Sequence, residues 1–131
     1  MAKKIFLICP VRFASEEEKQ ILADYVAGLE NQGFQVHYPS RDTNQVDPTG
    51  GYQICTDNRK AIINADEVHL YWSKASQGSL FDLGVAFSEH IDKGKPIKLV
   101  NRKDIERIVA EEQKPKSFEK VFLLVDEKSR Q

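Results

Sequence analysis

Residues 65–100 read ADEVHLYWSKASQGSLFDLGVAFSEHIDKGKPIKLV, and this segment predicts a strand, a short loop, a helix and a second strand in succession. The apolar run at 68–72 is the first strand, and the small polar residues at 73–78 form the loop. We expect the helix to start at Ser79, to stop at Gly94, and to be followed by a strand over 95–100. One turn into the helix lies an acid, Asp82. Small ligands bind at the carboxyl ends of strands in open α/β sheets, so this loop marks a candidate site.

The rest of the chain alternates between strands and helices in the same way. A continuous apolar run at 5–9 is typical of a strand buried on both faces. Ser15 and Glu18 have the form of a capping box at the start of the next helix, which should stop at Gly33. Further strands are predicted at 34–38 and 121–125, and further helices at 52–65 and between Asn101 and Pro115, with a frayed tail at 126–131. Residues 39–51 form the longest irregular stretch, and such loops are often functional.

This β-α-β-α-β-α-β-α-β order predicts a single α/β domain over residues 1–131. Strict alternation favours a mostly parallel sheet of about five strands with helices on both faces, a three-layer α/β/α arrangement of flavodoxin-like type. The loops that begin at Pro10, Pro39 and Ser73 would then meet at one edge of the sheet. We expect any ligand or chemistry at that edge.

Composition and charge exclude several classes of function. The chain carries 19 basic and 20 acidic residues, so no strong field attracts nucleic acid or an anionic membrane. No apolar run is long enough for a signal peptide or a membrane span, which predicts a cytoplasmic protein. Cys9 and Cys55 lack the spacing of metal ligands, so we expect two reduced thiols and no metal site.

The segment around Asp82 resembles the nucleoside 2-deoxyribosyltransferase family, which includes enzymes that hydrolyse the N-glycosidic bond of nucleotides. The family pattern is a strand, a small loop, a helix with Glu-Leu-Gly-x-Ala, and then Gly-Lys-x-Val. Here the matching residues are Asp-Leu-Gly-Val-Ala at 82–86 and Gly-Lys-Pro-Ile at 94–97. The resemblance implies a carboxylate nucleophile that holds the sugar covalently, a second acid on the preceding helix, no cofactor, and assembly as a homo-oligomer.

Three positions depart from the family pattern. The nucleophile position holds Asp82, one methylene shorter than Glu, and a misplacement of this order can cost about 100-fold in rate. Phe6 stands where a Tyr would donate a hydrogen bond to the nucleophile. The second acid lies eight residues before Asp66 in the pattern, and that position is Asn58, with Asp57 one helical step away. The resemblance therefore makes Asp82 the candidate nucleophile and Asp57 its candidate helper.

Simpler explanations of these residues stay open at this point. Asp82 could belong to a capping box begun by Ser79, and Asp57 could be solvated. Arg12 could bind a phosphate, although the acidic turn at 16–18 favours a neutral nucleoside over a nucleotide. The candidate substrate-binding residues are Pro10, Arg12, Asn58, Ser73, Gly78 and Ser79.

The sequence therefore predicts a protein that cleaves or transfers the N-glycosidic bond of a 2-deoxyribonucleoside. The altered positions also fit a binding module of the same fold that holds a nucleoside or nucleotide without catalysis. A flavodoxin-like interaction domain with no small ligand is a third interpretation, and it would leave Gly78, Ser79 and Asp82 without a joint purpose.

Overall fold

The computed structural model describes residues 2–131 and contains a parallel sheet of four strands in the order β2-β1-β3-β4, together with six helices. The strands are β1 (Lys4–Ile8), β2 (Gln35–His37), β3 (Glu67–Leu70) and β4 (Ile97–Leu99). The helices are α1 (Glu16–Asn31), α2 (Pro39–Asp42), α3 (Tyr52–Asn64), α4 (Gln77–Lys93), α5 (Arg102–Glu112) and α6 (Phe118–Ser129). This strand order is the first part of the flavodoxin-like order 2-1-3-4-5.

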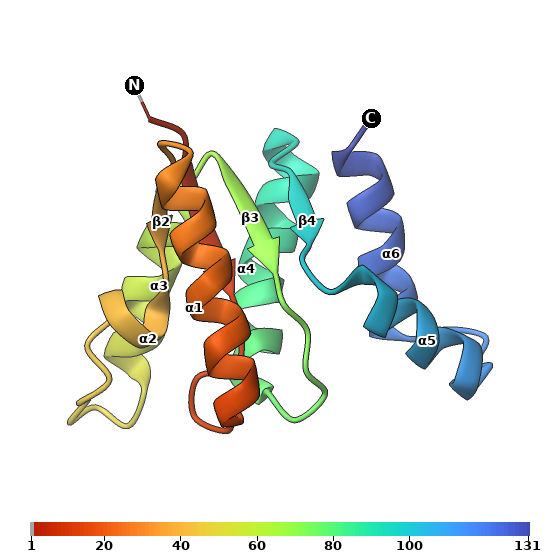
Figure 1. Cartoon of the computed structure of the whole chain (residues 1–131), viewed down its shortest axis with the longest axis horizontal. Coiled ribbons are helices and arrows are strands. Elements are labelled where there is room, and N and C mark those ends of the chain that lie inside the picture. The colour runs from red at the N-terminus through yellow and green to blue at the C-terminus, as the bar shows by residue number, and fades with distance from the viewer. Residues whose placement is uncertain (1) are drawn as a thin grey trace.

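Helices cover both faces of the sheet, with α1 on one face and α3 and α4 on the other (Figure 1). The alternation of β1 sets this division, because Leu7 and Cys9 join the core under α1 while Phe6 and Ile8 join the core under α3 and α4. The prediction of a strand buried on both faces is therefore confirmed for β1.

The helix limits follow from short local signals. Ser15 and Glu18 form the predicted capping box at the start of α1, in which each side chain accepts a hydrogen bond from the other residue's backbone N–H. Gly94 ends α4 with φ of 71°, a left-handed conformation that favours glycine. In the described part of the chain, residues 2–131, no helix combines the length and apolar character that crossing a bilayer requires.

The predicted fifth strand at 121–125 is wrong, because these residues belong to α6. Phe118, Phe122 and Val125 recur at the helical spacing of three to four residues, and the Ser117 side chain caps the helix by accepting from the backbone of Lys120. A short apolar run fits a strand or a buried helix equally well, and here the cap and the flanking apolar residues decide. Figure 1 shows α6 lying beside β4, where a fifth strand would otherwise pair.

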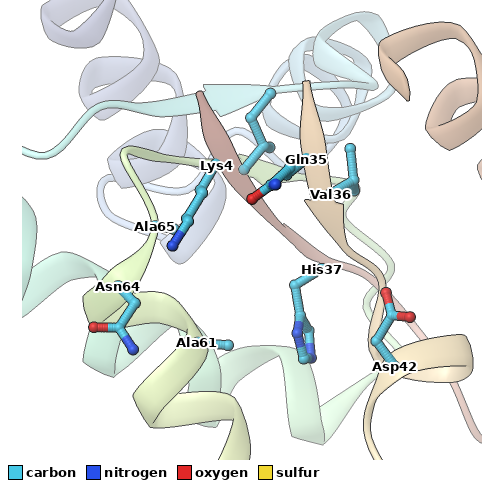
Figure 2. Close-up of a pocket in the computed structure, with 9 residues that line it drawn as sticks. Lys4, Gln35, Val36, His37, Asp42, Ala61, Asn64 and Ala65 are labelled. Carbon is cyan, nitrogen blue, oxygen red and sulfur yellow. The ribbon is translucent and has the colours of Figure 1, made fainter. Parts of the chain in front are cut away.

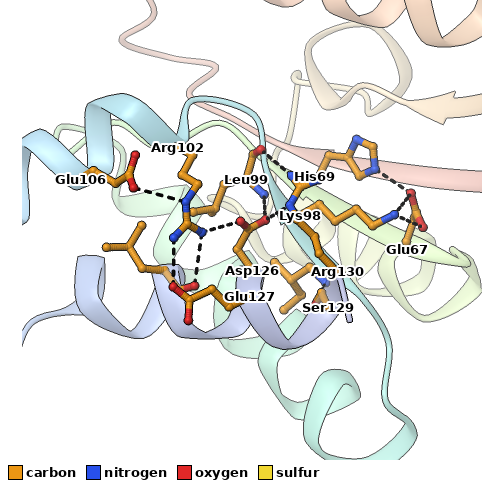
Figure 3. Close-up of polar contacts among 12 residues, drawn as sticks. Glu67, His69, Lys98, Leu99, Arg102, Glu106, Asp126, Glu127, Ser129 and Arg130 are labelled. Carbon is orange, nitrogen blue, oxygen red and sulfur yellow. Dashed lines mark hydrogen bonds and ion pairs between the residues drawn. The ribbon is translucent and has the colours of Figure 1, made fainter.

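Side chains of α6 and of Arg130, the residue that follows it, make hydrogen bonds to the free edge of β4, where a fifth strand would have paired. The backbone N–H of Leu99 donates to Asp126 Oδ1 at 2.7 Å, and that of Ile97 donates to Ser129 Oγ at 2.9 Å. Arg130 donates to the carbonyl oxygen of Leu99 at 3.2 Å (Figure 3). The expectation of a frayed tail at 126–131 is therefore also wrong, since Asp126 is fully buried.

Candidate active site

A cleft of about 600 Å³ lies at the carboxyl ends of β1 and β3. Its walls come from the loops after β1, β2 and β3 and from the beginnings of α3 and α4. The lining residues are Cys9, Val11, Arg12, Phe13, Pro39, Gln45, Ile54, Cys55, Asn58, Ala75, Ser76, Gln77, Gly78, Ser79 and Asp82. The three predicted loops therefore do meet, at the point in the sheet where α/β proteins usually bind ligands.

Asp82 projects into this cleft from the second turn of α4. The helix begins at Gln77, after an N-cap at Ser76 whose hydroxyl accepts from the backbone N–H of Ser79 at 3.2 Å. The predicted start at Ser79 is therefore two residues late, and Asp82 lies too far along the helix to complete a capping box. This geometry removes the simple explanation of Asp82 as a cap.

The environment of Asp82 makes this carboxyl easier to protonate than an ordinary aspartate, although it still ionises below neutral pH. Burial raises the pKa of this carboxyl to about 6, while a hydrogen bond from Asn58 acts in the opposite direction and lowers it. In this bond the side-chain amide Nδ2 of Asn58 donates to Asp82 Oδ2 at 3.3 Å. A carboxylate with a pKa close to neutral inside a cleft is typical of a group that reacts or changes its protonation.

Asn58, and not its neighbour Asp57, is the residue of α3 that faces Asp82. Asn58 is 6% exposed and lines the cleft, at the position given by counting eight residues back from Asp66. Asp57 does not line the cleft, and its Oδ1 accepts from Gln53 Nε2 at 2.8 Å on the solvent side of the helix. The structure therefore does not bring the two predicted catalytic acids together.

Some of the predicted substrate-binding residues line the cleft, and others do not. Gly78 and Ser79 line the cleft with Asn58, whereas Pro10 and Ser73 do not. The two neighbours of Pro10, Cys9 and Val11, do line it. Both excluded residues belong to the turns that shape the loops: Pro10 is buried, and the carbonyl oxygen of Ser73 accepts from the backbone of Ser76 at 3.1 Å.

Arg12 is the one basic side chain among the cleft residues of the described chain, and its guanidinium lies 5.5 Å from the ring centre of Phe13. The acidic residues Glu16, Glu17 and Glu18 do not line the cleft, and Glu18 is held in the capping box of α1. These acids therefore do not stand against an anionic ligand in the cleft, as the sequence had suggested.

Both cysteines of the chain line the cleft as free thiols. Burial, and then the nearby Asp82 carboxylate, raise the pKa of Cys9 to about 12. The pKa of Cys55 is raised by the same two causes and by Asp47. Since a thiol with a raised pKa stays protonated at neutral pH, these residues give the cleft an uncharged wall and no thiolate nucleophile.

The loop between α2 and α3 fixes the start of α3. Asp47 accepts from the backbone N–H groups of Thr49 at 2.7 Å and Ile54 at 3.0 Å, and Thr49 Oγ1 accepts from the backbone of Gln53 at 2.9 Å. These bonds satisfy two of the free N–H groups at the helix start, a task that the N-cap Gly51 lacks a side chain to perform. The long loop therefore holds in place the helix that carries Asn58.

Sequence reasoning missed Thr43 and His37, which stand behind Asn58. Thr43 lies in the loop that was singled out by its length, but a single hydroxyl in an irregular segment gives no periodic signal. His37 is the last residue of a short strand, and nothing in the strand pattern distinguishes it from any other residue there. Within residues 2–131, no three His, Cys, Asp or Glu side chains gather as a metal site requires.

No protein-family model and no curated protein matches the chain. Among solved structures it is similar to the CMP N-glycosidase BcmB of Clostridium botulinum, with 27% sequence identity and a TM-score of 0.54, over 74% of this chain and 70% of that one. The resemblance drawn from the sequence is confirmed at this level, because it included enzymes that hydrolyse the N-glycosidic bond of nucleotides.

Proposed function

We propose that this protein cleaves the N-glycosidic bond of a nucleoside or nucleoside monophosphate and passes the sugar to water or to another base. The observation that carries the proposal is Asp82, a largely buried carboxylate whose pKa is raised to about 6, which lines a cleft at the ligand-binding edge of the sheet. The structural likeness to a CMP N-glycosidase supports the same class of bond.

The proposed mechanism uses Asp82 as the nucleophile. Its ionised oxygen forms a bond to the anomeric carbon as the bond from that carbon to the base nitrogen breaks, and the base leaves with the electron pair and takes a proton from water. Water, or a second base, then attacks the same carbon, which releases the sugar, returns the carboxylate and gives the remaining proton to solvent.

Arg12 makes a monophosphate the favoured form of the substrate. A guanidinium binds phosphate oxygens in a bidentate manner, and Arg12 reaches the cleft from the loop after β1. The N-terminus of α4 borders the same cleft and contributes a positive dipole end at Gln77 and Gly78. An anionic 5′-phosphate would thus find positive charge on two sides.

A specific observation also favours the second interpretation, a binding module without catalysis. Asp82 is the sole carboxylate that lines the cleft in the described chain, whereas glycosidases use a pair of acids. Phe6 is fully buried and offers no hydroxyl to the nucleophile. In this case the cleft would hold the nucleotide, and the bond would stay intact.

Base release decides between the two functions. Purified protein is incubated with CMP, dCMP, cytidine, deoxycytidine, and deoxyadenosine plus cytosine, and free base is quantified by chromatography. We expect release to be fastest with a monophosphate. The Asp57→Asn variant should retain the activity, because its carboxylate lies outside the cleft. Absence of released base across the panel would exclude the enzyme, and thermal stabilisation by the same ligands, roughly 2.7 kcal/mol at 100-fold saturation, would then identify the binding module.

We further propose that the protein forms a homo-oligomer through an apolar groove between α4 and α6. The groove has a volume of about 390 Å³, and its lining includes Leu80, Phe87, Phe118 and Val121, all partly exposed. No charged side chain lines it in the described residues, so the same surface of a second copy is complementary to it. Contiguous apolar surface of this kind on a soluble domain usually marks an interface.

The Phe87→Glu variant tests this interface. The charge would have to be buried at the contact without a partner, so the oligomer should dissociate to a species near the chain mass of 15.0 kDa in light scattering after size exclusion. The matched control is Val46→Glu, since Val46 is an exposed apolar residue in a loop away from the groove. A wild-type protein that already runs at the chain mass would contradict the proposal.

A further inference from the structure

A chain of three hydrogen bonds leads from β2 to the candidate nucleophile. His37 Nε2 lies 2.8 Å from Thr43 Oγ1, the Thr43 hydroxyl donates to Asn58 Oδ1 at 2.7 Å, and Asn58 Nδ2 donates to Asp82 Oδ2 at 3.3 Å. Thr43 is 5% exposed, so water does not compete for its hydroxyl. Buried polar groups of this kind are costly unless each has its partner, and here each does.

The direction of every bond in the chain is fixed by counting protons. The single hydroxyl proton of Thr43 is used on Asn58 Oδ1, so His37 Nε2 has to be the donor in its bond to Thr43. Burial lowers the pKa of His37, which leaves a neutral ring with its proton on Nε2 at neutral pH. Since Oδ1 of Asn58 faces Thr43, its NH2 group has to face Asp82. A reversed amide would place an oxygen against the carboxylate.

We propose that His37 and Thr43 are positioning residues that act through Asn58 to keep an amide donor aimed at Asp82, so that the carboxylate is held ionised and oriented in the cleft. The effect of these positioning residues on turnover rests on the proposed function, but their effect on Asp82 can be measured without any substrate.

The packing around His37 supports this assignment. Its ring stacks on Phe6 with centroids 5.2 Å apart and an angle of 12° between the planes. Figure 2 shows His37 reaching from β2 toward Ala61 of α3, beside a hollow of about 280 Å³ that Asp42 also lines. Phe6, at the position where the family pattern has a tyrosine, thus holds His37, the first residue of the hydrogen-bond chain, in place.

Few charged or titratable groups lie near His37 and Asp82, the two ends of the hydrogen-bond chain. Around His37 they are Asp42 and Arg41 of α2 and Asp57 of α3. Asp57 and Asp42 raise the pKa of His37 and Arg41 lowers it, but burial is the largest effect.

The carboxylate of Asp82 lies close enough to Cys9, after β1, and to Cys55 of α3 to raise their pKa values, and Arg12 lines the same cleft. The two thiols stay neutral, as their raised pKa values require. Burial is the largest effect on the pKa of Asp82, and the hydrogen bond from the Asn58 amide is the side-chain interaction that opposes it.

The test compares Thr43→Val, which keeps the shape and removes the hydroxyl, with Thr43→Ser, which restores the hydroxyl. The Asp82 pKa is read by carbon NMR of aspartate-labelled protein without ligand. In Thr43→Val the Asn58 amide is free to turn, so we expect the pKa to rise by about one unit. Thr43→Ser should stay at the wild-type value. His37→Phe keeps the stacking on Phe6 and removes the donor to Thr43, so it should also raise the Asp82 pKa. This variant provides the test if Thr43→Val does not fold.

The turnover number gives a second readout. If the protein is an enzyme, Thr43→Val should lower kcat about 10-fold with little change in KM, as expected for an interaction that orients the reacting group. An unchanged Asp82 pKa in folded Thr43→Val or His37→Phe protein would overturn the inference, whether or not base is released. If the Asp82 pKa shifts in the variants but the wild-type protein releases no base, the positioning role of His37 and Thr43 stands and the enzyme is rejected.

Discussion

Replacing Asp82 with asparagine is expected to abolish base release and, at the same time, to make the protein more stable. Loss of a nucleophile typically costs about 10⁴-fold or more in kcat. The gain in stability follows from the pKa of about 6 in the folded protein, above the ordinary value of 3.8. Between these two pH values the folded state binds more protons than the unfolded state, so stability is lost as the pH rises through about 6.

The two-unit difference in pKa corresponds to about 2 to 3 kcal/mol at pH 7.5. Asp82→Asn removes this cost, so its free energy of unfolding should exceed that of the wild type by that amount at pH 7.5 and by almost nothing at pH 4. Denaturant unfolding at the two pH values measures the difference. In the wild type, base release should increase with pH up to about 6, because the ionised carboxylate is the reactive form. Equal stability of the two proteins at pH 7.5 would show that Asp82 is not buried at a cost.

Replacing Asp126 with alanine is expected to destabilise the protein by about 3 to 5 kcal/mol, the range seen when one partner of a buried ion pair is removed. Asp126 is 0% exposed, and its carboxylate accepts from Arg102 at 2.6 Å, from Arg130 at 2.9 Å and from the backbone of Leu99 at 2.7 Å (Figure 3). The variant leaves an unpaired N–H on β4 and two guanidinium groups without their shared partner. A domain of ordinary stability has about 5 to 15 kcal/mol in total, so a large part of it would be lost.

Glu127→Ala provides the matched control. Glu127 also binds Arg102, at 3.1 Å, but its side chain is 56% exposed, and an exposed ion pair contributes about 0 to 1 kcal/mol. Urea unfolding followed by circular dichroism should separate the two variants clearly. If both variants lose the same small amount of unfolding free energy, the contacts of Asp126 between α6 and β4 do not stabilise the protein as proposed.

Much of the architecture could be predicted because local signals and tertiary packing agree. The apolar run of β1, the capping box of α1 and the glycine that ends α4 each specify one structure. The run at 121–125 does not, because five apolar residues fit a strand or the buried side of a helix. The choice depends on Asp126, Ser129 and Arg130 reaching the edge of β4, a contact between segments about 30 residues apart that no local pattern contains.

The candidate site shows the same division between local and long-range information. Asp82 could be predicted from the family motif, and the count back from Asp66 led to the position on α3 that faces it. Whether Asp57 or Asn58 enters the cleft depends on the rotation of α3, since adjacent residues differ by about 100° around a helix. That rotation is fixed by Asp47 and the loop before the helix. Thr43 and His37 could not be found from sequence, because their role exists only once three separate segments have met.

The way α6 ends the sheet has a consequence for behaviour at high concentration. An uncovered border strand offers backbone groups to any neighbouring molecule and invites polymerisation through strand pairing. On β4 those groups are already occupied by a carboxylate and a hydroxyl of α6 and by the guanidinium of Arg130 just after it, while the opposite border, β2, is three residues long. The molecule should therefore resist fibril formation for as long as its last helix stays docked, and loss of that helix would be the first step toward aggregation.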